Sequence, residues 1–176
     1  MRLTVMTVLL GLFAAPVAQA QTAETRLANG SRFAGWTVTC EALAVNETAC
    51  VLTQRLVREG GDLLLADLVA FPQPDGDGAY LAARVPNGVY LPHGFALRPA
   101  AETAEETRFV WQSCTPQLCE ALVLLTVDEL AALEAAGPEI VAGYRPALGA
   151  SPLVFALDLT GIGEGVAALR AAGARQ

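Results

Sequence analysis

The sequence predicts a mostly β fold, namely one antiparallel β-sandwich or barrel-like domain that is stapled by disulfides and carries two short α-helices near its C-terminal part. Three observations predict it. Short segments of alternating or continuous apolar residues recur along the chain. Turn-forming Gly, Pro and Asn residues separate these segments. An even number of cysteines follows a segment that is typical of protein export.

Residues 1–20 have the order of a cleavable signal peptide. Arg2 is followed by the apolar stretch 3–15, by Pro16 and by the small-residue sequence Ala-Gln-Ala at 18–20. The apolar stretch is shorter than the roughly 20 residues that a membrane-spanning helix needs. We therefore expect cleavage after Ala20, and the alternative is an uncleaved membrane anchor.

The remaining chain is expected to form one domain. Residues 21–32 are polar and contain too few apolar side chains to pack, so we expect a flexible N-terminal arm. Residues 33–176 are long enough to bury a single hydrophobic core. The apolar runs of this domain are too short or too interrupted to cross a membrane. The net charge of −7 disfavours nucleic acid as a partner, because like charges repel the phosphate backbone.

The strands are predicted from their apolar patterns. In segment 35–41, Trp36, Val38 and Cys40 alternate with polar residues, which is typical of a strand with one buried face. A second strand follows Cys50. Because the strands are close in sequence, we expect them to pair antiparallel. A nearly continuous apolar run predicts a central strand at 62–71, and further strands are predicted at 80–85, 89–91, 95–98, 107–113, 120–125 and 153–159.

The first helix is predicted at 127–136 from the residues at its two ends. Thr126 and Glu129 form the T-x-x-E pattern of a capping box, in which each side chain satisfies an unpaired amide of the other residue. Gly137 supplies a residue that adopts left-handed backbone easily, and Pro138 cannot continue a helix.

The second helix is predicted after the last strand, where Ile162, Val166 and Leu169 form an apolar stripe. The sequence GIGEG at 161–165 opens this helix, as a dinucleotide-binding fingerprint would. Val166 stands where the last glycine of that fingerprint belongs. We therefore interpret the glycines as permitting a sharp turn, and we expect no nucleotide site.

Four cysteines permit three pairings, of which we expect Cys40 with Cys50 and Cys114 with Cys119. Each of these pairs brackets a short loop between two predicted strands. The spacings C-x9-C and C-x4-C differ from those of zinc-binding thiolate pairs and from the C-x-x-C of redox-active disulfides. We therefore expect structural disulfides.

We expect no catalytic residue, no metal site and no cofactor. His93 is the only histidine, and we interpret it as an exposed turn residue because turn formers flank it. The serines at positions 31, 113 and 151 lie in no nucleophile motif. PDGDG at 74–78 is similar to part of a calcium loop but lacks the further oxygen ligands of such a loop.

Several motifs occur in a fixed order along the domain. They are GWTVTCE at 35–41 with a second cysteine ten residues after the first, VPNGVYLPHGFALRP at 85–99, a later Cys-containing strand, VDELAALEAAG and PLVFALDLTGIGEGVAAL. Together they resemble the invasion-associated locus B family over about residues 33–169. Two positions depart from the family pattern. The family tends to have glycine in place of Leu118 and Phe in place of Ile162.

The resemblance implies that residues 33–176 form a β-rich domain that is periplasmic, associated with the outer membrane or secreted. Some members of the family are linked to the invasion of host cells, and none has an established catalytic residue. We therefore expect a non-enzymatic envelope protein that acts through an unknown protein or surface partner, in host-cell interaction or envelope maintenance. The alternative is a periplasmic carrier of a small apolar molecule or lipid, because a β-rich body can enclose a cavity.

Overall fold

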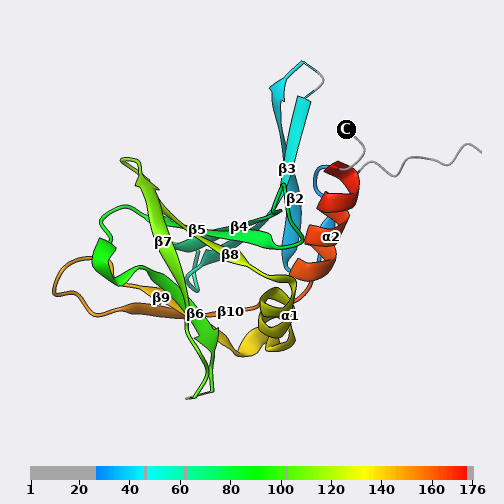
Figure 1. Cartoon of the computed structure of the whole chain (residues 1–176). Helices are drawn as coiled ribbons and strands as arrows, with labels where there is room; N and C mark the ends of the chain where they lie inside the picture. Colours follow the sequence, from blue (N-terminus) through cyan, green and yellow to red (C-terminus); the bar gives the residue numbers. More distant parts are fainter. Residues whose placement is uncertain (1–26, 46, 62, 102, 174–176) are drawn as a thin grey trace, which may run out of the picture.

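The computed structural model describes residues 27–45, 47–61, 63–101 and 103–173. The predicted signal peptide at 1–20 and residues 21–26 of the predicted arm lie outside the described residues. The described chain forms one ten-stranded antiparallel sheet that curls into a half-barrel, with two α-helices near the C-terminal part (Figure 1). Of the two architectures that the sequence allowed, the structure has the barrel-like one.

The sheet has the strand order β1-β2-β3-β4-β5-β8-β7-β6-β9-β10. Neighbouring strands are antiparallel throughout, and two of the pairs, β5 with β8 and β6 with β9, join strands that are not consecutive in the chain. The elements are β1 (Arg32–Phe33), β2 (Trp36–Ala44), β3 (Glu47–Val57), β4 (Leu64–Pro72), β5 (Ala79–Pro86), the 3-10 helix η1 (Leu91–His93), β6 (Phe95–Pro99), β7 (Thr107–Cys114), β8 (Leu118–Leu125), α1 (Val127–Ala135), the 3-10 helix η2 (Gly137–Glu139), β9 (Ile140–Tyr144), β10 (Leu153–Leu157) and α2 (Ile162–Gly173).

The core lies on the inner face of the curled sheet. Alternate residues of each strand face it, so that Trp36 in β2, Leu68 in β4 and Leu81 in β5 are fully buried. Helix α2 packs on β1–β4 through its apolar stripe, and α1 packs against α2 and β8. The outer face of the sheet is consequently left for other contacts.

The predicted strands differ from the observed ones at two places. The strand predicted at 89–91 is wrong, because Leu91 begins the 3-10 helix η1 and the two residues before it belong to no strand. Pro92 lacks an amide for a strand ladder, and Gly94 has a φ of 69°, which ends the segment in left-handed backbone. Strand β9 was not predicted, since its sequence IVAGY is short and contains Gly143, a residue that weakens a strand pattern.

The described part of the predicted arm, residues 27–32, is bonded to β2. The amide of Gly30 donates to the carbonyl of Val38 at 2.8 Å, and the amide of Val38 donates to the carbonyl of Ser31 at 2.8 Å. The side-chain oxygen of Asn29 accepts from the amide of Cys40 at 3.1 Å. The packed domain therefore begins near Leu27, which is partly buried against the core, and not at Phe33.

Helix α1 has the capping box that the sequence predicts. The amide of Glu129 donates to Thr126 Oγ1 at 3.3 Å, and the amide of Thr126 donates to Glu129 Oε2 at 2.8 Å. The bond from the Thr126 amide to the Glu129 carboxylate, together with one from Thr126 Oγ1 to the same oxygen at 2.8 Å, favours the carboxylate form and holds the pKa of Glu129 below its usual value. The helix ends at Ala135, one residue before the predicted end.

The glycines of GIGEG fit closely against neighbouring elements. Gly161 has a φ of 87°, and a Cβ there would lie 2.8 Å from the carbonyl carbon and oxygen of Phe33. A Cβ on Gly165 would lie 2.5 Å from Leu52 Cδ1 in the core. The amides of Gly161 and Gly163 donate to the carboxylate of Glu134 in α1, at 2.7 and 3.2 Å. A side chain of the protein itself therefore occupies the start of α2, where a nucleotide phosphate would bind.

Replacing Gly161 with alanine is expected to lower the free energy of unfolding by about 2–4 kcal/mol, since the Cβ adds both left-handed strain and a clash with the backbone of Phe33. Urea unfolding followed by circular dichroism measures this change. Gly173→Ala is the matched control, because nothing lies within 4 Å of a Cβ at that position. Equal midpoints for the two variants would show that the close contact at Gly161 carries no energy.

Candidate functional site

The structure joins Cys40 to Cys50 and Cys114 to Cys119, the pairs expected from the sequence. The Cα atoms are 4.0 Å apart in each pair, and the paired cysteines lie directly opposite each other on adjacent strands. One bridge staples the β2–β3 hairpin, which reaches beyond the rest of the domain in Figure 1. The other staples the β7–β8 hairpin. Both disulfides therefore hold projecting hairpins and do not join distant parts of the sheet.

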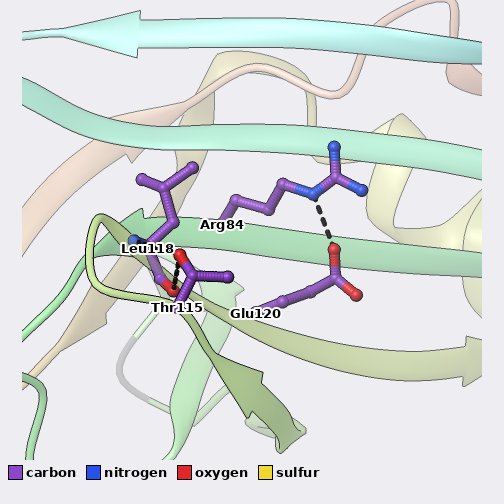
Figure 2. Close-up of polar contacts among 4 residues, drawn as sticks. All are labelled: Arg84, Thr115, Leu118 and Glu120. Carbon is purple, nitrogen blue, oxygen red and sulfur yellow. Dashed lines mark hydrogen bonds and ion pairs between the residues drawn. The ribbon is translucent and has the colours of Figure 1, made fainter.

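The turn between β7 and β8 is fixed by a second set of contacts. The amide of Thr115 donates to the carbonyl of Leu118 at 2.7 Å, and the amide of Leu118 donates to Thr115 Oγ1 at 3.0 Å. Figure 2 shows these two residues in contact across the turn. Leu118 begins strand β8 and does not have a positive φ, so glycine is not required at this position.

The residues examined for catalysis lie on separate elements. His93 ends η1, Ser113 lies in β7, and Asp77 lies in the loop between β4 and β5. Arg170 of α2 donates to the carbonyls of Asp77 and Gly78 at 2.6 and 2.7 Å, which ties this loop to the helix. Among the residues that the structure describes, no group of three or more His, Cys, Asp or Glu side chains could hold a metal ion.

A groove of about 480 Å³ lies over β6, β7, β9 and β10, on the side of the sheet that points away from the core. Four strand positions on its floor form one row, because Ala96 pairs with Arg108 on one side and with Gly143 on the other, and Gly143 pairs with Val154. A Cβ on Gly143 would lie 2.7 Å from the carbonyl oxygen of Leu153. Small side chains in the middle of this row therefore make the floor of the groove.

Three arginines surround this floor, namely Arg98 in β6, Arg108 in β7 and Arg145 directly after β9. Arg98 Nη1 donates to the carbonyls of Pro99 and Ala101 at 3.2 and 3.1 Å, and Arg145 Nη1 donates to the carbonyl of Ala150 at 2.7 Å. These bonds fix the two guanidinium groups through one nitrogen each and leave the other N–H groups for a ligand. Arg145 Nε is buried and has no hydrogen-bond partner among the described residues.

The rim of the groove adds charged and aromatic groups. Arg108 Nε pairs with Glu106 Oε1 at 2.7 Å, and His93 lies at the rim with its ring 5.1 Å from the ring of Tyr90. On the core side of β9, burial raises the pKa of the Tyr144 hydroxyl above its usual value. Among the described residues, the lining of the groove thus has three guanidinium groups against one carboxylate, on a chain whose net charge is −7.

This local excess of positive charge favours an anionic ligand. Guanidinium groups keep their charge at any physiological pH, and they bind carboxylate or phosphate through two parallel hydrogen bonds.

The sequence model described as "Invasion associated locus B (IalB) protein" matches residues 36–170. The chain belongs to the invasion-associated locus B family. This membership confirms the resemblance drawn from the ordered motifs. In the fold as well, this family member is similar to the crystal structure of invasion associated protein B from Bartonella henselae. The TM-score is 0.65 at 18% identity, with 82% of this chain and 97% of that chain covered, so the likeness shows a shared fold. No curated protein sequence matches the chain.

Family membership and two disulfides indicate that this invasion-associated locus B protein is extracytoplasmic. No helix within the described residues is long and apolar enough to cross a membrane.

The groove of this family member was not predicted from the sequence. Arg98 and Arg108 lie ten positions apart on β6 and β7, whereas Arg145 lies far along the chain after β9, and no spacing in the sequence marked the three as one site. The one local signal is the alternation of Phe95 and Leu97, both buried, with Ala96 and Arg98 on the opposite face. That alternation places Arg98 on the outer face but does not say which other strands lie beside it.

Proposed function

We propose that the protein is a non-enzymatic binding protein of the bacterial envelope that holds an acidic segment of a protein partner in the arginine-lined groove. The observation that carries this proposal is the convergence of Arg98, Arg108 and Arg145 around a floor of small residues, on an otherwise acidic chain. Strands from both sides of the β6–β9 pairing contribute, so the charge cluster depends on the tertiary fold.

The shape of the groove supports a polypeptide segment as the ligand. It opens to solvent and is lined by residues of four strands, whereas a site for a small molecule is usually enclosed on most sides. Its floor at Ala96 and Gly143 leaves room for a main chain, and the arginines on either side can take carboxylates. The same features support an anionic ligand over the apolar molecule or lipid of the carrier alternative.

The cellular setting belongs to this proposal. The signal peptide at 1–20 supports export to the periplasm, from where the protein stays, associates with the outer membrane or is secreted. The partner is then an envelope or surface protein, in envelope maintenance or in contact with a host cell. A non-enzymatic role is supported by the separate placement of His93, Ser113 and Asp77.

Binding of a fluorescein-labelled hexaglutamate peptide, measured by fluorescence anisotropy, tests this proposal. The double variant Arg98→Gln/Arg108→Gln is expected to weaken binding about tenfold or more, because each lost charged hydrogen bond is worth about 1.5–3 kcal/mol. Affinity should also fall as ionic strength rises.

The matched control for this experiment is Arg32→Gln/Arg55→Gln, which removes the same charge from outside the groove. We expect it to change the affinity by less than about twofold, because salt largely screens surface charges that lie far from the groove. Equal weakening by the two double variants, or no binding by the wild-type protein, would overturn the proposed function.

A further inference from the structure

A row of alternating charges crosses the outer face of the other half of the sheet. Arg55 in β3 pairs in register with Asp67 in β4, Asp67 pairs with Arg84 in β5, and Arg84 pairs with Glu120 in β8. Residues that are directly opposite on adjacent strands point to the same face. The row therefore reads positive, negative, positive, negative across four neighbouring strands.

The charges of this row are paired within the chain but not removed from solvent. Arg84 Nε lies 2.6 Å from Glu120 Oε2, as Figure 2 shows, and Arg55 Nη1 lies 3.7 Å from Asp67 Oδ2. The side chains of Arg55 and Arg84 are 67% and 46% exposed. Each charge can therefore contact a group on another molecule without leaving its own partner.

Two apolar rows lie beside the charged row on the same face. They continue the same strand register, so the first row has one residue from each of β3, β4, β5 and β8, and the second has one from each of β4, β5 and β8. No other element covers the upper side of β4, β5 and β8 in Figure 1, which is the side away from the core. The first row is Thr53, Val69, Ala82 and Leu122, and the second row is Phe71, Tyr80 and Leu124.

The exposed part of this apolar surface lies in the second row and on β7, because Val69 and Ala82 in the first row are buried. The rings of Phe71 and Tyr80 stack with centroids 5.3 Å apart, Leu124 is 46% exposed, and Val110 extends the patch onto β7 with 67% exposure. A contiguous exposed apolar patch bordered by charges is typical of a protein interaction site. We call the three rows together the outer face.

We propose that the outer face packs against the outer face of a second copy of the chain, around a two-fold axis that runs parallel to the strands between β4 and β5. Such an axis reverses the order of the strands in the second copy, so each row meets itself in reverse. The charged row then places Asp67 opposite Arg84 of the partner subunit, and Arg55 opposite Glu120 of the partner subunit.

The same axis also matches the apolar rows. Phe71 meets Tyr80 of the partner subunit. Two sheets stacked face to face with nearly aligned strands are a common way to bury apolar faces. The charge order positive, negative, positive, negative is complementary to its own reverse, which favours a second copy over a partner that carries one sign of charge.

Charge reversal at two positions tests this interface. In a dimer of Asp67→Arg, two arginines face each other at both symmetry-related contacts, and in a dimer of Arg84→Asp two aspartates do so. We expect the wild-type protein to be a dimer and each variant to be a monomer, by sedimentation over a concentration series. An equimolar mixture of the two variants should form a heterodimer, because each arginine at 67 then faces an aspartate at 84.

The apolar part of the outer face gives a second readout that does not depend on the charges. Leu124→Asp should give a monomer, whereas Leu148→Asp, at an exposed leucine in the loop between β9 and β10 outside both the outer face and the groove, should stay a dimer. A monomeric wild-type protein would overturn the inference. So would a dimer that persists in the charge variants, or a mixture of these variants that stays monomeric. Neither the outer face nor these variants involve the groove, so a failure here leaves the proposed function standing.

Discussion

Replacing Trp36 with alanine is expected to lower the free energy of unfolding by about 3–5 kcal/mol, which is the usual cost of truncating a buried large aromatic side chain. Trp36 is fully buried at the start of β2, and Phe33 in β1 is its partner in the strand register. Helix α2 packs over β1 and β2, so the lost volume lies between the sheet and that helix. The unfolding midpoint in urea, followed by circular dichroism, measures the loss.

Trp36→Phe separates the loss of volume from the loss of the indole N–H. Trp36 Nε1 is buried without a hydrogen-bond partner, so removing it costs no hydrogen bond within the described residues. We expect the phenylalanine variant to lose much less stability than the alanine variant. If alanine cost less than about 1 kcal/mol, the site would not be part of a close-packed core.

Removing either disulfide is expected to lower the free energy of unfolding by about 2–3 kcal/mol, because the bridge restricts the unfolded chain. Replacing Cys40 and Cys50 with alanine should cost slightly more than replacing Cys114 and Cys119. The first bridge closes a sequence separation of 10 residues and the second a separation of 5. Alanine is preferred to serine because Cys119 is fully buried.

The two losses should add, since the bridges lie on β2–β3 and β7–β8 with two other strands between these pairs in the sheet. Urea unfolding of the wild-type protein with and without dithiothreitol gives the combined loss. A variant in which all four cysteines are replaced with alanine should not respond to dithiothreitol. Wild-type protein whose unfolding midpoint is unchanged by the reductant would contradict the role of the bridges.

The sequence was sufficient where the physical signal is local. The capping box of Thr126 and Glu129 and the apolar stripe of the last helix depend on residues within one or two turns. The cysteine pairs were predictable because each joins two strands of one hairpin, so proximity in sequence becomes proximity in space.

The sequence was insufficient where distant strands meet. Strand β9 pairs with β6 across more than forty positions, and its residues Ile140–Tyr144 carry too weak a pattern to reveal that pairing. The 3-10 helix at Leu91–His93 replaced a predicted strand because turn residues on both sides override a short apolar run. The groove depends on this pairing, since Arg98 and Arg145 come from β6 and from the residue after β9.

The molecule thus offers two surfaces on different parts of one curled sheet. The groove over β6, β7, β9 and β10 is positively charged, and the outer face of β3, β4, β5 and β8 is apolar with balanced charges. A dimer through the outer face would leave the groove of each copy open. Two grooves in one assembly would bind a partner with two acidic segments more tightly than one groove does.

The central claim is that the arginine groove is a binding site for an acidic segment, and the side-chain Nε–H signals of arginine in a nitrogen-15 NMR spectrum test it most directly. Arg145 Nε is buried without a hydrogen-bond partner in the described part of the chain, and the bonds of the other two groove arginines there use only some of their N–H donors. On titration with hexaglutamate peptide, we predict that the signals of Arg98, Arg108 and Arg145 shift together, while those of Arg55 and Arg84 do not. If the groove signals stay fixed at saturating peptide, or if arginines outside the groove shift in their place, the claim is contradicted.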